Sequence, residues 1–487
     1  MSRIYDLRSA LEFLKGMPGE YAETDVEIDP VGEIGGVYRY LGANGTILRP
    51  TRTGPALLFN NVKGFPGVRC SIGLLGARHR VAAMLGLPAD GLARGFLRAA
   101  QNPILPITVP ADHAACREVV HRADEDGFDL RNIIMGLRNA PTDAGPYITM
   151  GIVRASDPET GAADVTIHRI VMIGRDECGI MAKPGMRHIG DFHKKAEESG
   201  KPLPITVSIG NDPAVSIGVC FAPPATPIGC DELGTAGGLR GRPIELVPAL
   251  TVSETAIAHS EYIIEGMMMP NVRVKEDRET KTGRGMAEFG GYTGPAGEVP
   301  LIKVTAVTHR RDPIIQVCLG NSDEHVAMSG TAAAAGILGL CERALPGRVT
   351  NCCCPSAGGG KFMAILQIAK QAGEDGEQIN AGLLAFSAYR ELKHVILVDE
   401  DVDIYDMSDV VWAMNTRFQA NLDLVKIEGA KGHPAEPSAS PQYDASVYAR
   451  GITCKAIFDC TVKTTLKEKF ERSRFMELDY RKWFPDL

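Results

Sequence analysis

The stretch Val165-Thr-Ile-His-Arg-Ile-Val-Met-Ile173 decides how the middle of this sequence folds. Its β-branched residues favour a strand, in which successive side chains point to opposite faces. Every second residue from Val165 to Ile173 lies on one face, and all of these except Arg169 are apolar. Because a guanidinium removed from water must be paired, we expect Arg169 to form an internal ion pair or to lie beside a cleft.

Similar short runs surround this strand and predict a barrel-like sheet in the middle of the chain. They are β-branched or alternating and are separated by turn residues. One helix, at 189–199, is expected to interrupt them, and the capping-box pattern Thr251-x-x-Glu254 predicts the start of a second, short helix. The predicted strands are Tyr147–Val153, Val165–Ile173, Leu203–Ile209, Val215–Phe221, Ile244–Leu250, Tyr262–Met268, Leu301–Val307 and Ile314–Leu319.

The sequence on either side of this region mixes helices and strands. Residues 6–16 predict a first helix with Asp6 as its N-cap, and one strong strand is predicted at His394–Val398. With 487 residues the chain exceeds the size of one core, so we expect a multidomain α/β and α+β protein. Its predicted domains are an α/β domain at 1–140, the barrel domain at 141–320 and an α/β domain at 321–487. The helices predicted in the last domain are 329–345, 361–371, 379–389, 408–418 and a terminal helix from about 464.

Composition excludes several classes of function. The 52 Lys and Arg residues are outnumbered by 60 Asp and Glu residues, a formal charge of −8, whereas a nucleic-acid-binding protein needs a basic surface. No apolar run is long enough for a membrane span, and charges lie where a signal peptide needs apolar residues, so we expect a cytoplasmic protein with no nucleic-acid or membrane partner. Three thiolates cannot easily converge from one strand, so Cys352-Cys353-Cys354 does not indicate a metal site.

Asp164, His188 and Glu232 are candidate metal ligands. A mixed set of one imidazole and two carboxylates suits Mn²⁺ or Mg²⁺ better than a thiol-rich zinc site would. The three residues are far apart in the sequence, and each has an ordinary alternative: a hydrogen-bonded structural histidine, or a solvated turn around Asp231-Glu232. Spacing alone leaves both interpretations open.

Several separated motifs, taken together, resemble those of the UbiD-like decarboxylases. They occur in the family's order and approximate spacing, and the resemblance extends from about residue 145 to 465. The motifs are Asp164-Val-Thr-Ile-His-Arg169, His188, Asp231-Glu-Leu-Gly-Thr-Ala-Gly-Gly238, Glu261-Tyr-Ile-Ile-Glu-Gly266 and Ala287-Glu-Phe-Gly-Gly-Tyr292. The resemblance implies a split β-barrel that binds prenylated FMN and a metal ion in the domain at 141–320.

The resemblance also implies how the cofactor is held. Asp164, His188 and Glu232 match the residues that bind Mn²⁺ or Mg²⁺, accompanied by K⁺, against the flavin phosphate, and Asp164 stands where asparagine is commoner. Aspartate still offers oxygen ligands and adds negative charge beside the phosphate. The other implied cofactor contacts are Thr166, Ile167, Arg169 and Lys393, although Lys393 is also readable as an ordinary surface residue before a strand.

For catalysis, Arg169 and Glu288 match the family's arginine and one of its two glutamates. The other glutamate falls on Gly283, which predicts that a carboxylate beside the arginine is missing. The same absence occurs in the branch that acts on phenolic acids, the 3,4-dihydroxybenzoate decarboxylases. Matches at His325, Lys361 and His433 extend the resemblance to this branch and imply substrate-binding residues.

The implied reaction is the reversible, non-oxidative conversion of 3,4-dihydroxybenzoate to catechol. Such a reaction needs an electron sink that no side chain supplies, which is the reason for the flavin. The alternatives are the same chemistry on a phenazine, gallate or heteroaromatic carboxylate, a flavin reductase, and a non-enzymatic scaffold. The implied partners are the aromatic acid, a flavin prenyltransferase that supplies the cofactor, and further copies of the chain in a dimer or hexamer.

Overall fold

Six strands close into a barrel at the centre of the molecule, as the middle of the sequence predicts. The computed structural model describes residues 4–185, 187–221 and 229–485. Each barrel strand pairs with the next, and the last strand pairs back to the first. In order around the barrel they are β12 (Tyr262–Lys275), β9 (Leu203–Ile209), β6 (Tyr147–Ser156), β7 (Ala163–Met172), β8 (Glu177–Ile180) and β15 (Glu298–His309), with β5 (Val119–Arg122) added beside β15.

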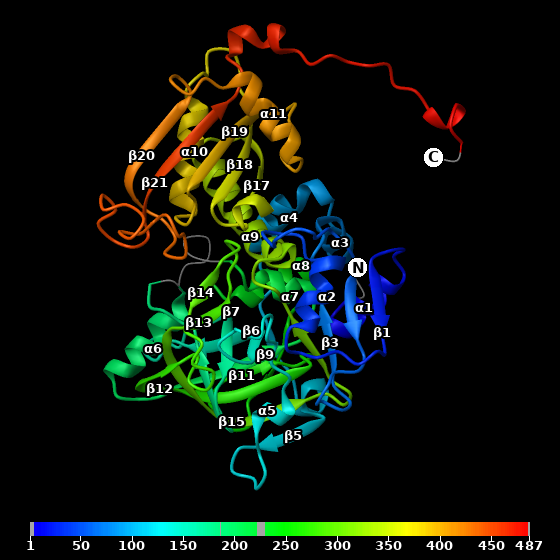
Figure 1. Ribbon diagram of the computed structural model, residues 1–487, viewed down its shortest axis with the longest axis vertical. Coiled ribbons are helices and arrows are strands. Elements are labelled where there is room, and N and C mark those ends of the chain that lie inside the picture. Colours follow the sequence, from blue (N-terminus) through cyan, green and yellow to red (C-terminus); the bar gives the residue numbers. More distant parts are fainter. Residues whose placement is uncertain (1–3, 186, 222–228, 486–487) are drawn as a thin grey trace.

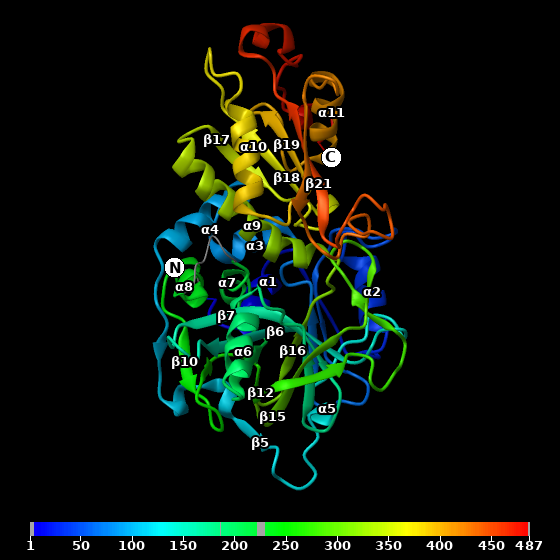
Figure 2. The same cartoon turned by 90° about the vertical axis from the view of Figure 1, so that its left-hand side faces the viewer.

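The barrel is filled by the apolar side chains that its alternating strands direct inward. Ile170, Ile205 and Val304 are among the buried residues of its core. Helix α6 (His188–Glu198), at the position predicted for a helix, packs against β12 and β6 (Figure 2), and its apolar face joins the buried core of the barrel. β12 follows the curvature of the barrel through two irregularities in its pairing with β15, where the local twist increases. Two smaller sheets lie beside the barrel: β4 (Ile107–Thr108), β10 (Glu245–Pro248) and β11 (Thr255–Ile257), and β13 (Arg284–Ala287) with β14 (Thr293–Pro295).

The N-terminal sheet is completed by a strand from much later in the chain. Its order is β1 (Tyr21–Thr24), β2 (Ala56–Phe59), β3 (Arg69–Ile72) and β16 (Ile314–Val317). The run 314–319 therefore forms a strand as predicted, but it runs parallel to β3 and lies outside the barrel. The helices of this part are α1 (Leu7–Lys15), α2 (Glu33–Leu41), α3 (Arg78–Leu85), α4 (Leu92–Gln101) and α5 (Leu130–Ile133).

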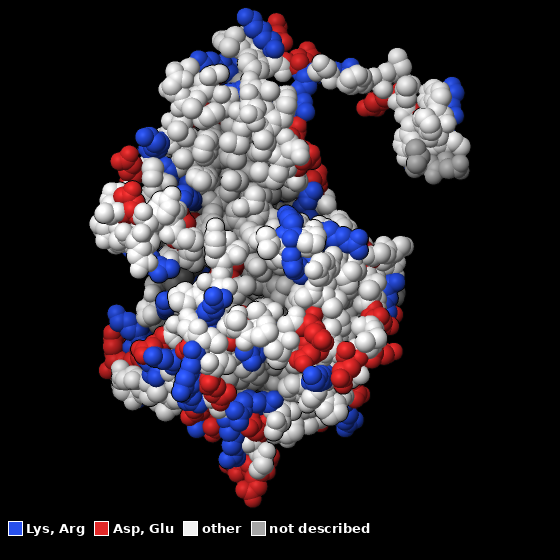
Figure 3. All heavy atoms as spheres, in the orientation of Figure 1, with Lys and Arg blue, Asp and Glu red and all other residues white. Residues whose placement is uncertain are grey.

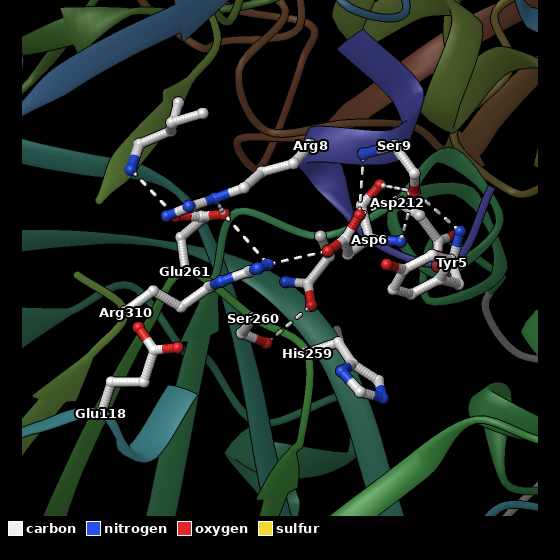
Figure 4. A network of polar contacts seen from close by, with 12 residues as sticks. Tyr5, Asp6, Arg8, Ser9, Glu118, Asp212, His259, Ser260, Glu261 and Arg310 are labelled. Carbon is white, nitrogen blue, oxygen red and sulfur yellow. Dashed lines mark hydrogen bonds and ion pairs between the residues drawn. The ribbon is translucent and has the colours of Figure 1, made fainter. Parts of the chain in front are cut away.

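A buried ion-pair network fastens α1 to the barrel (Figure 4). Asp6 caps the helix as predicted, and its carboxylate also accepts a hydrogen bond from Arg310. Arg8 donates to both oxygens of Glu261 at 2.8 and 2.9 Å, and Glu261 accepts a further bond from the backbone of Ile314. Glu261 belongs to one of the motifs that resemble the UbiD-like family, and its position shows that it anchors the N-terminal helix.

The C-terminal domain is an α/β layer that forms the upper part of the molecule in Figure 1. Its sheet runs in the order β17 (Val349–Cys353), β18 (Met363–Ile368), β19 (His394–Asp399), β21 (Ile452–Cys460) and β20 (Leu424–Lys431). Helices α10 (Glu377–Ala388) and α11 (Met407–Arg417) pack on it, and α9 (Asp323–Ala344) contacts α4 and α7 (Pro213–Gly218) as well as β17. The strand predicted at 394–398 and the helices near 329–345, 379–389 and 408–418 are confirmed.

Two runs fold into the opposite element from the one predicted. Residues 363–368 form β18 where the helix 361–371 was expected, because a short buried apolar run between two strands carries no distinctive period. Conversely, the strand predicted at Val215–Phe221 is wrong. Pro213 and the carboxylate of Asp212, which accepts from Val215 N at 3.0 Å, begin helix α7 (Pro213–Gly218) there.

The capping-box helix at 251–254 and the terminal helix from 464 are also wrong. The backbone and hydroxyl of Thr251 donate to Glu265 on β12, so these groups do not cap a helix. Between residues 464 and 485 the helical structure consists of 3₁₀ turns, at Thr464–Phe470 and Tyr480–Lys482, and residues 471–485 extend away from the body (Figure 1). Among the described residues, no helix has the length and apolar content needed to cross a bilayer.

Candidate active site

One cavity of about 720 Å³ lies between the barrel and the C-terminal domain. Its walls include segments that are distant in sequence, among them β7, residues 286–297, the first two turns of α9, and loops of the C-terminal domain. The volume is within the range of roughly 300–1,000 Å³ that is usual for pockets binding small molecules and cofactors. The residues predicted from sequence that line it are Thr166, Ile167, Arg169, Glu288, His325, Lys361 and His433.

The three predicted metal ligands come together beside this cavity. Asp164 lies near the start of β7, His188 is the first residue of α6, and Glu232 is the first residue of α8 (Glu232–Arg240). One potential ligand atom from each lies within 4.8 Å of the others. His188 Nδ1 is 3.0 Å from Asp164 Oδ1, and Thr166, one strand repeat beyond Asp164, lines the cavity.

The chemistry of this cluster fits a divalent cation. All three side chains are buried, and Asp164 Oδ2 has no hydrogen-bond partner among the described residues. Burial raises the pKa of Glu232, and repulsion from the neighbouring Asp164 carboxylate adds to this effect. A cation bound by oxygen and imidazole ligands would relieve that repulsion.

Arg169 is held between two carboxylates at the wall of the cavity. Its Nε and Nη2 donate to the two oxygens of Glu276, each at 3.0 Å, and its Nη1 donates to Glu288. The two carboxylates raise the pKa of the guanidinium against the effect of burial. The ion pair expected for Arg169 and the adjoining cleft are therefore both present.

The prediction that a carboxylate is missing beside Arg169 was wrong. Glu276, directly after β12, takes the place that the motif match assigned to Gly283. The Glu276 side chain is 1% exposed and also accepts hydrogen bonds from Tyr147 and the backbone of Gly297. Glu276 belongs to the charged run Lys275-Glu-Asp-Arg-Glu279, which is typical of a solvated turn. The sequence therefore contains no sign that one of these acids is buried.

Glu288 is the more accessible of the two glutamates. A tight turn follows it, in which Glu288 N donates to Tyr292 O and Gly291 adopts a positive φ of 85°. The Glu288 side chain is 30% exposed, against 1% for Glu276, and lines the cavity. This carboxylate therefore can meet a bound ligand while it remains paired with Arg169.

His325, Lys361 and His433 surround the ring of Phe289 at the other side of the cavity. The ring centroids of His325 and His433 lie 6.1 and 4.9 Å from that of Phe289, and Lys361 Nζ is 4.7 Å from it. Burial, followed by the charge of Lys361, lowers the pKa of His325 to about 3, and burial lowers that of His433 to about 4. Both imidazoles are thus neutral near pH 7, and His325 Nε2 is buried without a partner in the described structure.

Other cavity residues were not identified from the sequence. Lys183 and Arg187 bring positive charge to the wall, and His168 adds an imidazole whose Nδ1 donates to Met181 O at 2.8 Å. Nothing in their local sequence distinguishes them from surface cations and a structural histidine. Lys393, by contrast, does not line the cavity; its ammonium pairs with Glu436 and donates to Ser438.

Three domain families together match most of the chain. Residues 14–100 match the 3-octaprenyl-4-hydroxybenzoate carboxy-lyase N-terminal domain, residues 107–322 the Rift-related domain of that name, and residues 326–460 its C-terminal domain. All three are domains of UbiD proteins. The match extends over the barrel, the cavity and both flanking sheets.

Similar proteins of the same length include decarboxylases of phenolic acids. The chain is 50% identical over 483 residues to gallate decarboxylase from Lactiplantibacillus plantarum, covering 98% of this chain and 99% of the relative. It is 49% identical to the apo structure of a 3,4-dihydroxybenzoic acid decarboxylase from Enterobacter cloacae, with a TM-score of 0.94 and 99% of each chain covered. The UbiD-class enzyme HmfF from Pelotomaculum thermopropionicum, in complex with FMN, is 34% identical, with a TM-score of 0.87 and coverage of 99% of this chain and 100% of HmfF.

Proposed function

This chain belongs to the UbiD family of carboxy-lyases, and we propose that it removes carbon dioxide from a hydroxylated benzoic acid, first of all 3,4-dihydroxybenzoate. The observation that carries the proposal is the composition of one cavity. On one side of it, Arg169 can bind a carboxylate and Glu288 can transfer a proton. On the other side, the imidazoles of His325 and His433 and the ammonium group of Lys361 can hydrogen-bond to a phenolic hydroxyl. A cluster of potential metal ligands adjoins the same cavity.

We assign the cofactor site to β7 and the cation cluster. Asp164, His188 and Glu232 would hold Mn²⁺ or Mg²⁺, accompanied by K⁺, against the phosphate of prenylated FMN, with Thr166, Ile167 and Arg169 beside the flavin. When bound, this group supplies the electron sink that loss of carbon dioxide from an aromatic ring requires. Lys183 and Arg187 add positive charge to the cavity wall that a phosphate can use, and Lys393, which lies elsewhere, is not part of the assignment.

Arg169 and Glu288 are assigned the chemistry at the ring carbon. Arg169, fixed by Glu276, can orient the substrate carboxylate through hydrogen bonds whose geometry is set in advance. When the bond between ring carbon and carboxylate breaks, its electron pair stays with the ring and a proton must replace the carbon dioxide. Glu288 reaches the cavity and can deliver that proton, or remove it in the reverse direction.

His325, Lys361 and His433 are assigned the recognition of the phenolic hydroxyls. Each has a nitrogen that can hydrogen-bond to a hydroxyl group, and the ring of Phe289 between them offers an apolar surface for an aromatic ligand. Gallate, which carries one further hydroxyl, is a second candidate, because the gallate decarboxylase is as similar to this chain as the dihydroxybenzoate enzyme.

The experiment is co-expression with a flavin prenyltransferase, the partner expected to supply the cofactor, followed by an absorption spectrum and a carbon dioxide assay. The panel contains 3,4-dihydroxybenzoate, gallate, benzoate, a phenazine carboxylate and a heteroaromatic acid. We expect turnover of the hydroxylated benzoates and none of benzoate. Turnover of only a polycyclic or heteroaromatic acid would refute the assigned substrate class, and NAD(P)H oxidation without carbon dioxide release would indicate a flavin reductase.

We also propose that the chain works as a homo-oligomer, a dimer or hexamer, in which the extended C-terminal segment at 471–485 contacts another copy. Phe475 is 92% exposed and Trp483 54%, and further exposed apolar residues of this segment are Met476, Leu478, Tyr480 and Phe484. Figure 3 shows uncharged surface between the charged residues of this arm, next to an upper part of the molecule with few charges on the same face. Apolar surface of this kind is stabilised by burial against a partner.

A further inference from the structure

Glu391 lies one layer behind the substrate side of the cavity and contacts the groups assigned to hydroxyl recognition. It belongs to the short connection between α10 and β19, and its carboxylate accepts a hydrogen bond from Tyr389 at 2.9 Å. The same carboxylate is 3.5 Å from Lys361 Nζ and 4.0 Å from His433 Nε2. Glu391 itself does not line the cavity, so it meets a ligand only through these two neighbours.

The charge of Glu391 compensates the positive charge around it. The pKa of Glu391 is lowered to about 2, because the positive charges of Lys361 and Arg187 and the hydrogen bond from Tyr389 outweigh burial, which would raise it. Lys361 needs such a partner, since its ammonium is mostly buried, with a side chain 14% exposed, and lies over the ring of Phe289. An unpaired ammonium in this position would lose hydration without compensation.

The distances leave the donors of Lys361 and His433 available. Direct hydrogen bonds between these groups are about 2.7–3.2 Å long, and both separations from Glu391 are longer. The backbone N–H of Ala435 donates to His433 Nδ1 at 3.0 Å, so in the neutral imidazole Nε2 carries the hydrogen. Glu391 is therefore close enough to attract the two groups electrostatically. It is too far away to accept direct hydrogen bonds from them, so their N–H groups remain available to a ligand.

We propose that Glu391 is a positioning residue that holds the N–H groups of Lys361 and His433 toward a phenolic oxygen of the substrate. The inference rests on the proposed function, because it concerns the hydroxyl-binding side of the same cavity. A phenolic oxygen can accept from both donors at once, whereas a ring without a hydroxyl gains nothing from them. Glu391 thus contributes to selection for hydroxylated rings without touching them.

The test is a double-mutant cycle on ligand binding and turnover. Catechol binding by calorimetry and steady-state kinetics with 3,4-dihydroxybenzoate are measured for wild type, Glu391→Gln, Lys361→Met and the double variant. Glu374→Gln is the matched control, because the Glu374 side chain is also 22% exposed, lies in the same domain and pairs with one cation, Arg348, outside the cavity. Glu391→Asp tests rescue by a shorter carboxylate.

We expect Glu391→Gln to weaken catechol binding and raise KM about tenfold, with kcat changed less than threefold, and Glu391→Asp to recover part of the loss. Benzoate binding should not change. Glu391→Gln should cost less catechol affinity in the Lys361→Met background than in wild type, because only His433 then still depends on Glu391. Losses that multiply in the double variant, or wild-type binding by Glu391→Gln, would overturn the inference. If the Glu391 and Lys361 variants show this coupling in catechol binding but the wild type decarboxylates no hydroxybenzoate, the proposed function is refuted and the role of Glu391 stands. If the wild type binds neither catechol nor 3,4-dihydroxybenzoate, the proposed function and the role of Glu391 are both refuted.

Discussion

Arg169 and Glu276 form a two-point ion pair at the edge of the barrel, with both nitrogen to oxygen distances at 3.0 Å. The pair uses Nε and Nη2, and so Nη1 is the nitrogen that contacts Glu288. A guanidinium held at two points cannot rotate away when a ligand enters. Glu276 therefore fixes the direction of the Arg169 guanidinium, and Glu288 pairs with the one nitrogen that Glu276 leaves available.

Replacing Glu276 by Ala should destabilise the protein and abolish decarboxylation. The change leaves Arg169 largely buried with one remaining partner, which costs on the order of 3 kcal/mol of unfolding free energy. Denaturant unfolding and the carbon dioxide assay would measure the two effects. Glu279→Ala is the control, because Glu279 ends the same charged run but pairs with Arg131 at the surface. Equal behaviour of the two variants would contradict the role of Glu276.

Glu288→Gln should bind metal and flavin normally while decarboxylation falls at least about 100-fold, the lower end of the usual contribution of a general acid. Glutamine keeps the size and hydrogen bonding of the side chain but has no carboxylic proton to give. Deuterium exchange at the ring carbon of the product should be lost in parallel. Exchange at the wild-type rate in the loaded variant would assign the proton to another group, such as His325 or His433.

Glu232→Ala should lose bound metal and flavin together, because it removes one carboxylate from a site for a hard cation. Metal content by elemental analysis and flavin by absorbance provide the readout. Asp231→Ala separates metal loss from helix disruption: Asp231 caps α8 through Leu233 N, and its removal costs about 1 kcal/mol of stability. Full metal and flavin content in Glu232→Ala would exclude the site.

The contribution of His168 to stability should decrease as the pH falls from about 6.5 to 4. Burial lowers the pKa of His168 to about 4, whereas an unfolded histidine titrates near 6.5. Between these pH values the unfolded chain binds a proton at this histidine that the folded chain does not. The free energy of unfolding therefore decreases by up to about 1.4 kcal/mol for each pH unit by which the pH falls. His325 and His433 act in the same direction. The unfolding free energy of His168→Gln should therefore depend less steeply on pH in this window; parallel curves would contradict the argument.

Removing residues 471–487 should convert the oligomer to smaller species without changing the fold of the rest. Light scattering coupled to gel filtration measures the mass, and circular dichroism the fold. Replacing Phe475 and Met476 by Ser should have a similar effect, because both are almost fully exposed apolar side chains. Replacing the nearby charged residues Arg474 and Glu477 by Ser is the control. An unchanged mass after truncation would show that the arm has no part in assembly.

Much of the fold could be predicted because most barrel strands alternate clearly. Residues 203–209 form a strand with the predicted bounds, and α1 begins at its predicted cap. Predictions failed where local signals compete, as at Pro213, where a proline and a capping carboxylate outweigh the β-branched residues that follow. The pairing of β16 with β3 could not be predicted, because register between distant strands depends on tertiary packing.

The candidate site likewise contains residues that could be predicted from the sequence and residues that could not. The resemblance brought Asp164, His188 and Glu232 together correctly in space, and it placed Arg169 and Glu288 at one cavity. It did not find Glu276, which is hidden among solvated charges, or Glu391, which acts from behind the cavity wall. The sequence could not show that Lys393 pairs with Glu436, because the local context of a lysine before a strand is the same whether it reaches a ligand or a carboxylate.

The late fourth strand of the N-terminal sheet has a consequence for synthesis on the ribosome. β1, β2 and β3 emerge early, but the edge of β3 stays open until β16 has been translated, after residues 73–313. At about 5–20 residues per second this interval lasts roughly 10–50 s. During that time an unpaired strand edge is exposed to neighbouring nascent chains. The N-terminal sheet, although its first three strands are made early, can be completed only after the barrel between them and β16 has been made.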